Sequence, residues 1–461
     1  MADTITGWRR FAAMEPLAFA LLFAFSVSDN VMSDLFVYQT CKSTAALNIS
    51  DCDILHTNSS SDRAKDIEKL VQPHTTIVLI FKSCIDTIFP TIMSLFLGPW
   101  SDKNGRKPLL VIPFTGFLLG YFSLAILSNF NANPYWLLLS SIPSSLLGGF
   151  PAILLTFFCY ITDITDNQNR AWHLACIQTM ILIGMLLGLF VGPAVFSHFG
   201  YAAVFCISGI TCLIAVLHSL FFVKETVQSD SPQTLRSVFD KTLVKELFCA
   251  VTKKREGFDR CLVWSCILAI ALHVVILEGN GAVGFYFVSS KLGWNVSQYS
   301  AYSAAQMVMS IGGMLLIIRV VGSLLKLPET VIIILSCLST SVSGLAKAFV
   351  YKPWHMYFSA SIGMFSSSAT PVIRSIVSKS VPPQDLGKTF SLITTMEMTI
   401  PFATTPLYIY VYTHTLKYYP CPVWFLSAAL PVFIIILAVI IDRRWRRLKE
   451  SQYTPFEADI N

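Results

Sequence analysis

The chain has 461 residues, of which 54% are hydrophobic and 13% are charged. A typical soluble domain has about 25% charged residues, so a water-soluble protein of this length is excluded and most of the surface must face lipid. The net charge of +6 lies in short basic clusters beside apolar runs, which is typical of the cytosolic flanks of membrane spans and does not indicate nucleic acid as a partner.

Apolar runs long enough to cross a bilayer follow one another along the chain. A span needs about 20 mainly apolar residues. Twelve spans are predicted on this basis, near residues 14–38, 73–98, 108–129, 134–161, 170–197, 200–223, 261–289, 299–320, 328–349, 354–378, 386–412 and 422–441. The fold class is therefore an all-α membrane protein.

A charged stretch after the sixth span divides the chain into two halves. The predicted organisation is an N-terminal six-helix half over 1–223, with a glycosylated loop at 39–72, a cytosolic linker over 224–260, a C-terminal half over 261–441 and a cytosolic tail over 442–461. The linker is compatible with a short amphipathic helix over Leu235–Val251. Six spans plus six suggest two halves that rock about a site near the midplane.

Glycosylation sequons and basic clusters fix the expected orientation. The N-x-[ST] sequons are Asn48, Asn58 and Asn295. With twelve spans they all fall on one face, which is expected to be luminal or extracellular. The basic clusters lie on the opposite face, at Lys103/Arg106/Lys107, Lys253/Lys254/Arg255 and Arg443/Arg444/Arg446/Arg447. Both chain ends are then cytosolic.

A ten-residue motif joins the second and third spans. It reads Gly98-Pro-Trp-Ser-Asp102-Lys103-Asn-Gly105-Arg106-Lys107. Gly105 permits a tight turn, and Asp102 can face a helix N-terminus or an arginine of a neighbouring span. The motif resembles the signature G-x-x-x-D-[RK]-x-G-[RK]-[RK] of the major facilitator superfamily, and the alternative is an ordinary basic turn after a span. The equivalent loop of the second half, around 313–322, keeps Arg319 without an acidic partner.

Further segments resemble the solute carrier 46 family over nearly the whole chain. They are Glu15-Pro16-Leu17, the signature turn with Pro108-Leu109-Leu110, Ser303-Ala304-Ala305-Gln306 and Thr370-Pro371-Val372-Ile373-Arg374. The resemblance implies a major facilitator 6+6 architecture. It also implies transport of bulky organic anions with protons: folates, cyclic dinucleotides or peptidoglycan fragments.

Arg374 in the tenth span falls where the family resemblance implies a role in substrate binding and proton coupling. A guanidinium offers a fixed fork of donors to a carboxylate or phosphate. The alternative is an arginine near the end of its span that extends to the membrane interface.

The expected proton-coupling acid is absent from the fifth span. The folate transporter of the family has a glutamate there, whereas this chain has Gln178, which cannot titrate. Glu397, in the eleventh span, is a carboxylate where that transporter has an uncharged residue. We therefore expect Glu397 to act as the proton-linked acid with Arg374 as its partner; a purely structural carboxylate is the alternative.

Other polar groups within the spans are weaker candidates. Asp29 and Asp34 lie in the first span, where they could bind a cation or proton or merely face a wet cavity mouth. His273 and Glu278 precede Gly279-Asn-Gly281, which is predicted to break the helix and act in gating. A lone histidine is more often a packing residue. Lys82 and Asp86, four residues apart, are expected to pair with each other.

The cysteines predict one disulfide and no cofactor. Cys41 and Cys52 share the glycosylated loop, and Cys421 lies on the same face, where oxidising conditions favour a disulfide. The simplest pairing is Cys41–Cys52; the family pattern instead joins this loop to the one after span 7, which has no cysteine here. No spacing indicates a metal or haem site.

The leading functional prediction is a secondary active transporter of an organic anion, coupled to protons. The sequence contains no phosphate loop of the kind that an ATP-driven pump requires. It also contains no repeated filter of the kind found in channels and no clustered acid–base or nucleophile set of the kind found in enzymes. A transport-inactive membrane receptor or trafficking protein on the same fold is the alternative, since the fifth-span acid is missing. The expected protein is a lipid-embedded monomer of the plasma or endolysosomal membrane.

Overall fold

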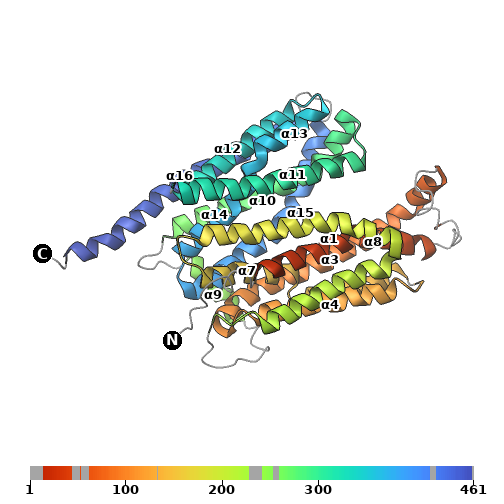
Figure 1. Ribbon diagram of the computed structural model, residues 1–461, viewed down its shortest axis with the longest axis horizontal. Helices are drawn as coiled ribbons and strands as arrows, with labels where there is room; N and C mark the ends of the chain where they lie inside the picture. The colour runs from red at the N-terminus through yellow and green to blue at the C-terminus, as the bar shows by residue number, and fades with distance from the viewer. Residues whose placement is uncertain are drawn as a thin grey trace. The chain divides into compact units, whose positions relative to one another are not determined.

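The structure is a computed structural model that describes residues 14–43, 52, 62–131, 133–227, 241–252, 259–325, 327–415 and 422–458. Within these ranges all regular structure is helical (Figure 1). Apolar runs separated by short polar turns favour this outcome, because a helix satisfies every backbone hydrogen bond within its own segment.

The chain folds into two compact units. One contains residues 1–157 and 180–238, and the other contains 158–179 and 239–461. The first unit is built from α1 (Glu15–Ser43), α3 (Asp62–Asn104), α4 (Pro108–Leu127), α5 (Pro134–Leu137), η2 (Leu138–Ser140) and α6 (Ser141–Leu146). Two further helices, α7 (Gly149–Ile164) and α8 (Arg170–Phe221), contribute residues to both units.

The second unit contains the remaining helices. They are α9 (Lys241–Thr252), α10 (Arg260–Leu292), α11 (Val296–Ile317), η4 (Ile318–Leu324), α12 (Glu329–Ala348), α13 (Pro353–Ile362), η5 (Gly363–Ser368), α14 (Ala369–Ser380), η6 (Pro383–Asp385), α15 (Leu386–Thr415) and α16 (Pro422–Ala458). Within this unit α10 packs against α15 and α16, and α12 packs against α16. The described part of the linker holds α9, while 235–240 of the predicted linker helix lie outside the described residues.

Nine helical segments of the described chain are long and apolar enough to span a membrane. One of them, Arg170–Phe221, contains two predicted spans, which a kink at Gly200 with φ of 75° separates. The predicted tenth and eleventh spans do not belong to the nine. The tenth is divided into α13, η5 and α14, and the eleventh, α15, carries charged and hydroxyl residues that lower its hydropathy.

The predicted helix break at Gly279–Gly281 is wrong, because α10 runs unbroken from Arg260 to Leu292. The glycine instead allows a close approach: a Cβ at Gly279 would overlap the Tyr408 ring of α15. Gly281 has open space around its Cα and a helical backbone. Local signals mark the true end of α10, at Gly293 with φ of 66°.

Small residues let α8 pack tightly on α1 within the first unit. A Cβ added at Gly184 would lie 2.5 Å from the backbone oxygen of Phe19, and one at Gly188 would lie 2.6 Å from Ser26 Cβ. These glycines therefore form a packing surface. It places the first span directly against the first half of α8.

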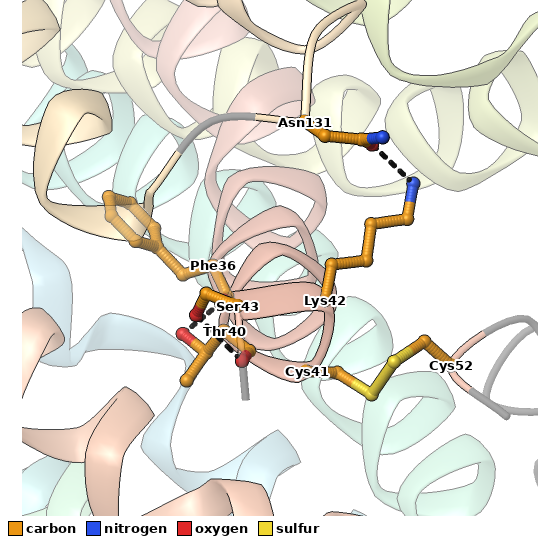
Figure 2. The surroundings of a disulfide bond; sticks show 7 residues. All are labelled: Phe36, Thr40, Cys41, Lys42, Ser43, Cys52 and Asn131. Carbon is orange, nitrogen blue, oxygen red and sulfur yellow. Dashed lines mark hydrogen bonds between the residues drawn. A yellow bond between two sulfur atoms is a disulfide. The ribbon is translucent and has the colours of Figure 1, made fainter. Parts of the chain in front are cut away.

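The predicted Cys41–Cys52 disulfide is confirmed, with Cα atoms 5.9 Å apart (Figure 2). Cys421, the third cysteine considered, lies outside the described residues. Next to the disulfide, Lys42 Nζ donates to Asn131 Oδ1 at 3.1 Å and lies 4.1 Å from the centre of the Tyr38 ring. The Lys42–Asn131 hydrogen bond fixes the end of α1 to the loop that follows α4, and the disulfide links the same end of α1 to Cys52.

Among the sequons, Asn48 and Asn58 lie outside the described residues, and Asn295 is exposed at the start of α11. Its Oδ1 accepts a hydrogen bond from the Gln298 N–H at 2.9 Å, which caps the helix and leaves Nδ2 for a glycan. Ser297→Ala removes the sequon but keeps this cap. When the protein is expressed in cells that glycosylate, we expect this variant to lose the apparent mass of one glycan on a gel. Treatment of the wild type with a glycosidase should remove the difference.

Asn295→Gln supplies the matched comparison, because it removes both the sequon and the cap. It is expected to lose the same glycan step and also to lower the free energy of unfolding by about 1 kcal/mol. An unchanged gel position for both variants would place the α10–α11 loop on the cytosolic side and overturn the expected orientation.

Candidate functional site

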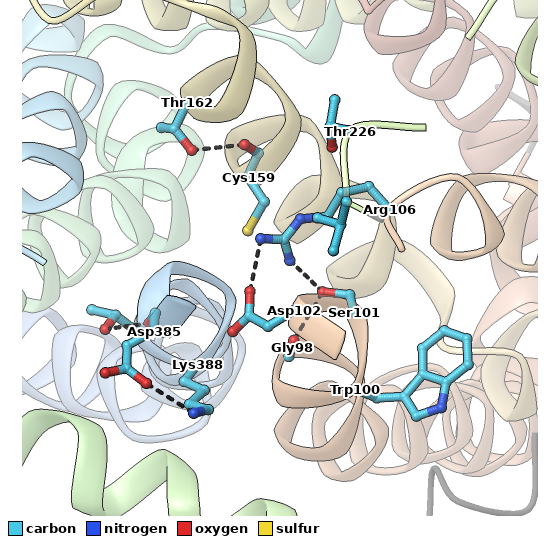
Figure 3. A network of polar contacts seen from close by, with 12 residues as sticks. Gly98, Trp100, Ser101, Asp102, Arg106, Cys159, Thr162, Thr226, Asp385 and Lys388 are labelled. Carbon is cyan, nitrogen blue, oxygen red and sulfur yellow. Dashed lines mark hydrogen bonds and ion pairs between the residues drawn. The ribbon is translucent and has the colours of Figure 1, made fainter. Parts of the chain in front are cut away.

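The signature turn of the first unit is held by a buried ion pair (Figure 3). Arg106 Nη2 lies 2.7 Å from Asp102 Oδ1, and the two side chains are 2% and 3% exposed. Arg106 also donates from Nη1 to Ser101 Oγ at 2.5 Å. The sequence left open a helix N-terminus or an arginine of a neighbouring span as the partner of Asp102. The observed partner is an arginine of the same motif.

The turn is also bound by Glu225, just after the sixth predicted span. Its carboxylate accepts backbone N–H bonds from Arg106 at 2.6 Å and Lys107 at 3.0 Å, where α4 begins. Gly105, with φ of 114°, gives the carboxylate room, because a Cβ there would overlap it. An anion at exposed helix N–H groups is favourable. The signature is therefore completed by a residue more than a hundred positions away.

The central feature of the second unit is an ion pair between α14 and α15. Arg374 Nη2 lies 2.5 Å from Glu397 Oε1 and 2.7 Å from Oε2. The two side chains are 5% and 10% exposed. The structure thus pairs Arg374 with Glu397, the partner predicted for it in the neighbouring span. A buried pair of this geometry is stable only while both charges are present.

One face and one donor of the Arg374 guanidinium have further roles. The guanidinium carbon lies 3.7 Å from the centre of the Phe158 ring, a stacked cation–π contact. Its Nε is buried and donates no hydrogen bond in the described part of the chain. The group is therefore held flat by the ring and keeps a donor for another acceptor. Phe158 was not predicted, and an aromatic residue in an apolar run gives no sequence signal for this role.

Other charged groups near the end of α14 are paired. Glu329 Oε1 accepts from Lys379 Nζ at 2.7 Å and from Ser375 Oγ at 3.1 Å. Lys388 lies 2.8 Å from Asp385 Oδ1. Arg374 differs from these residues, because both of its hydrogen bonds to Glu397 leave from the same nitrogen, Nη2.

The remaining candidates of the second unit are separated by their exposure. His273 is buried on α10, 3% exposed, within electrostatic range of Arg374. Glu278 is exposed on the same helix, and Gln178 is half-buried on α8. Arg319, the remnant of the second-half signature, lies in η4 with its guanidinium 5.6 Å from the centre of the Trp172 ring.

The candidates of the first unit form structural contacts. Asp34 accepts a short hydrogen bond from the Tyr201 hydroxyl of α8, a partner that the sequence did not indicate. Lys82 and Asp86 form the expected pair at 2.6 Å. Asp29 is half-buried and lies within electrostatic range of that pair. In the described residues no group of histidine, cysteine and acidic side chains could hold a metal ion.

Comparison with known proteins gives one family and consistent relatives. The family profile of the Major Facilitator Superfamily matches residues 83–406. "Probable peptidoglycan muropeptide transporter SLC46" of Drosophila melanogaster is 28% identical, over 94% of this chain and 86% of the relative. The "Proton-coupled folate transporter" of Bos taurus is 23% identical over 93% of this chain and 92% of its own. The resemblance to the solute carrier 46 family is thereby confirmed.

Solved structures agree on the fold. The human organic anion transporter MFSD10 (TETRAN) has a TM-score of 0.68 at 14% identity, covering 94% of this chain and all of its own. FucP in the outward conformation has a TM-score of 0.63 at 14% identity, covering 94% and 99%. At this identity the likeness concerns the fold alone. The named relatives are membrane transporters and not enzymes.

Asp102→Asn tests the signature pair. It removes the negative charge that lies 2.7 Å from the buried Arg106 guanidinium, so we expect the free energy of unfolding to fall by about 3–5 kcal/mol. The measurement is the thermal unfolding midpoint of the purified protein. Lys103→Gln, at an exposed position of the same motif, is the control and should change stability by less than about 0.5 kcal/mol. Equal midpoints for the two variants would contradict a stabilising role for the pair.

Proposed function

Because this chain belongs to the Major Facilitator Superfamily, we propose that it carries an organic anion across a membrane together with protons, through the Arg374–Glu397 pair. The observation that carries the proposal is this buried pair, which joins an anion-binding group to a proton-binding group. Relatives named as proton-coupled carriers of folate, or of steroid conjugates and bile acids, support it. Those compounds are organic anions.

Arg374 is suited to bind the anion. Its planar guanidinium presents several donors in a fixed geometry that matches a carboxylate or phosphate. Stacking on Phe158 holds the plane in place, and the buried Nε has no acceptor in the described residues. A substrate carboxylate that approaches along the side of Nε would form a bidentate contact with Nε and one terminal nitrogen.

Glu397 is suited to couple protons to that step. When ionised, it occupies Arg374 Nη2 with both oxygens and competes with a substrate anion. When a proton binds to Oε1 or Oε2, the attraction is lost and the guanidinium becomes available to the substrate. After the substrate leaves, the buried guanidinium again requires a counter-charge, which favours release of the proton. One proton and one anionic group therefore bind together.

The other candidate residues are less suited than Glu397 to couple protons. Gln178 cannot titrate, and Glu278 is exposed on α10. His273 is buried on α10, within electrostatic range of Arg374. We assign Asp29 and Asp34 a structural or mouth-facing role in the first unit, since Asp34 is already bonded to Tyr201. The signature residues Gly98, Asp102, Lys103, Gly105, Arg106 and Lys107 are assigned to conformational change.

The proposed setting is a multi-pass protein of the plasma or endolysosomal membrane, with both ends cytosolic. One relative is named a lysosomal symporter, and the sequons and basic clusters support the orientation. We propose a monomer, because the anion and proton sites both lie on one chain. The transport-inactive alternative has no support among relatives named as transporters.

Glu397→Gln separates coupling from a structural role. The amide resembles the protonated acid, so Arg374 should remain available at every pH. The measurement is uptake of a folate-class or bile-acid-class anion into proteoliposomes whose external buffer is set to a series of pH values. Wild-type uptake should rise by at least about fivefold when the external pH falls from about 7.5 to about 5.5. Uptake by the variant at the higher pH should approach the wild-type rate at the lower pH, with a flat profile between them.

Glu246→Gln is the matched control, because Glu246 is a partly exposed carboxylate of α9. It should keep the wild-type pH profile. If Glu397→Gln retains that profile, Glu397 is not the coupling acid. If its uptake is low at all pH values in a folded protein, the carboxylate has only a structural role.

A further inference from the structure

We propose that the second unit contains a separate anion-binding site around Lys347, which takes a carboxylate carried on an apolar or aromatic body. The site is a cavity of about 220 Å³ enclosed by α10, α11, α12, α13 and α16. By the same measure of volume, a single water needs about 15 Å³. The cavity is therefore large enough for a small organic anion. Neither Arg374 nor Glu397 lines it.

Lys347 supplies the positive charge. It lies in the last turn of α12 and is 7% exposed. Its Nζ lies 5.2 Å from the centre of the Trp424 ring. In the described part of the chain, the structure gives this ammonium no hydrogen bond to an acceptor and no carboxylate partner. Buried charges are ordinarily paired, because a single cation–π contact compensates little of the lost hydration.

Two unused hydrogen-bond donors lie in the same cavity. The Tyr302 hydroxyl of α11 and the Trp424 Nε1–H of α16 are both buried, and neither has a partner in the described residues. The residues that carry them are 2% and 1% exposed. Nearly all buried polar groups in proteins are hydrogen-bonded. An acceptor that reached both donors and Lys347 would satisfy all three groups at once.

The rest of the lining selects the type of ligand. None of the described residues that line the cavity is an aspartate or glutamate. Asn280 already accepts a hydrogen bond from Ser427 at 2.6 Å, so its oxygen is engaged within the helical bundle. Apolar and aromatic walls come from Ile276, Leu277, Tyr299, Met356 and Trp424. A cation and two unused donors, carried by residues that line one cavity with such walls, fit an aryl or alkyl carboxylate.

This site goes beyond the proposed function, since it uses different side chains. The carboxylate could belong to the transported anion or to a separate ligand, and transport of the probe distinguishes these sources. If the coupling role of Glu397 failed, the Lys347 cavity would still bind its anion.

The experiment measures binding to the purified full-length protein. The probe is 2-naphthoate, and 2-naphthylmethanol is the uncharged comparison. Binding to the folded state raises the thermal unfolding midpoint with the logarithm of the ligand concentration once this exceeds the dissociation constant. Naphthoate should raise the midpoint in this way, while the alcohol should not. Lys347→Gln should weaken naphthoate binding by at least about tenfold.

Lys352→Gln is the matched control, an exposed lysine of the same unit just before α13. It should bind naphthoate like the wild type. Tyr302→Phe and Trp424→Phe remove single neutral donors and should each weaken binding by about threefold to tenfold. They also keep the proposal testable if Lys347→Gln does not fold.

Two results would overturn the proposal. One is equal binding of the acid and the alcohol. The other is an unchanged dissociation constant in folded Lys347→Gln, or, where that variant does not fold, in both Tyr302→Phe and Trp424→Phe. If naphthoate binding is lost in Arg374→Gln but is unchanged in Lys347→Gln, the second result applies and the anion binds at the Arg374 site. If naphthoate is transported and Lys347→Gln lowers its uptake, the site lies on the transport route. If naphthoate binds but is not transported, the site takes a separate ligand. Both outcomes support an anion-binding site at Lys347.

Discussion

A charge buried among membrane-spanning helices needs a counter-charge or several hydrogen bonds, because neither lipid nor apolar side chains replace the lost water. Arg374 meets this requirement with one carboxylate and one aromatic ring. The pair joins α14 and α15, which are consecutive along the chain. Whatever changes the charge of Glu397 therefore changes the force between these two helices and the availability of the guanidinium. Anion binding and helix packing depend on the same contact.

Two buried arginine–carboxylate pairs in the described residues differ in what surrounds them. Arg106 has Asp102 and Ser101 within one motif, and the turn that carries it is bound again by Glu225. Arg374 retains a buried Nε without an acceptor in the described residues. A satisfied network fixes one arrangement, whereas an incompletely satisfied one can exchange partners. The first pair is suited to hold the signature turn, and the second is suited to accept a ligand.

The extent to which the sequence predicts this structure depends on the range of each interaction. Helix positions follow from apolar runs, and the Cys41–Cys52 bond follows from proximity along the chain. The partnership of Arg374 with Glu397 was predictable, since consecutive spans connected by a short loop lie side by side. The predicted break at Gly279 was wrong because a glycine in a span can serve packing as well as bending. Its true partner, Tyr408, lies more than a hundred residues away.

Contacts between segments far apart in the sequence could not be predicted from local sequence patterns. Phe158 is one aromatic residue within an apolar run, and its position under Arg374 requires α7 and α14 to meet. Glu225 lies just after the sixth predicted span, and its hydrogen bonds to the signature turn come from the fold.

Lys347 shows the limit of sequence reasoning most clearly. A lysine near the end of a span is ordinarily read as one that extends to the interface. The helical bundle instead encloses it, with the ring of Trp424 on one side and a cavity on the other. Its environment is composed of residues from several helices, and none of the described residues that line the cavity is an aspartate or glutamate. An unpaired cation and two unpaired donors in one cavity are energetically unfavourable for an isolated bundle. That shared deficit is what an anionic ligand would remove, and it distinguishes this lysine from Lys82, whose charge is compensated by Asp86 one turn away.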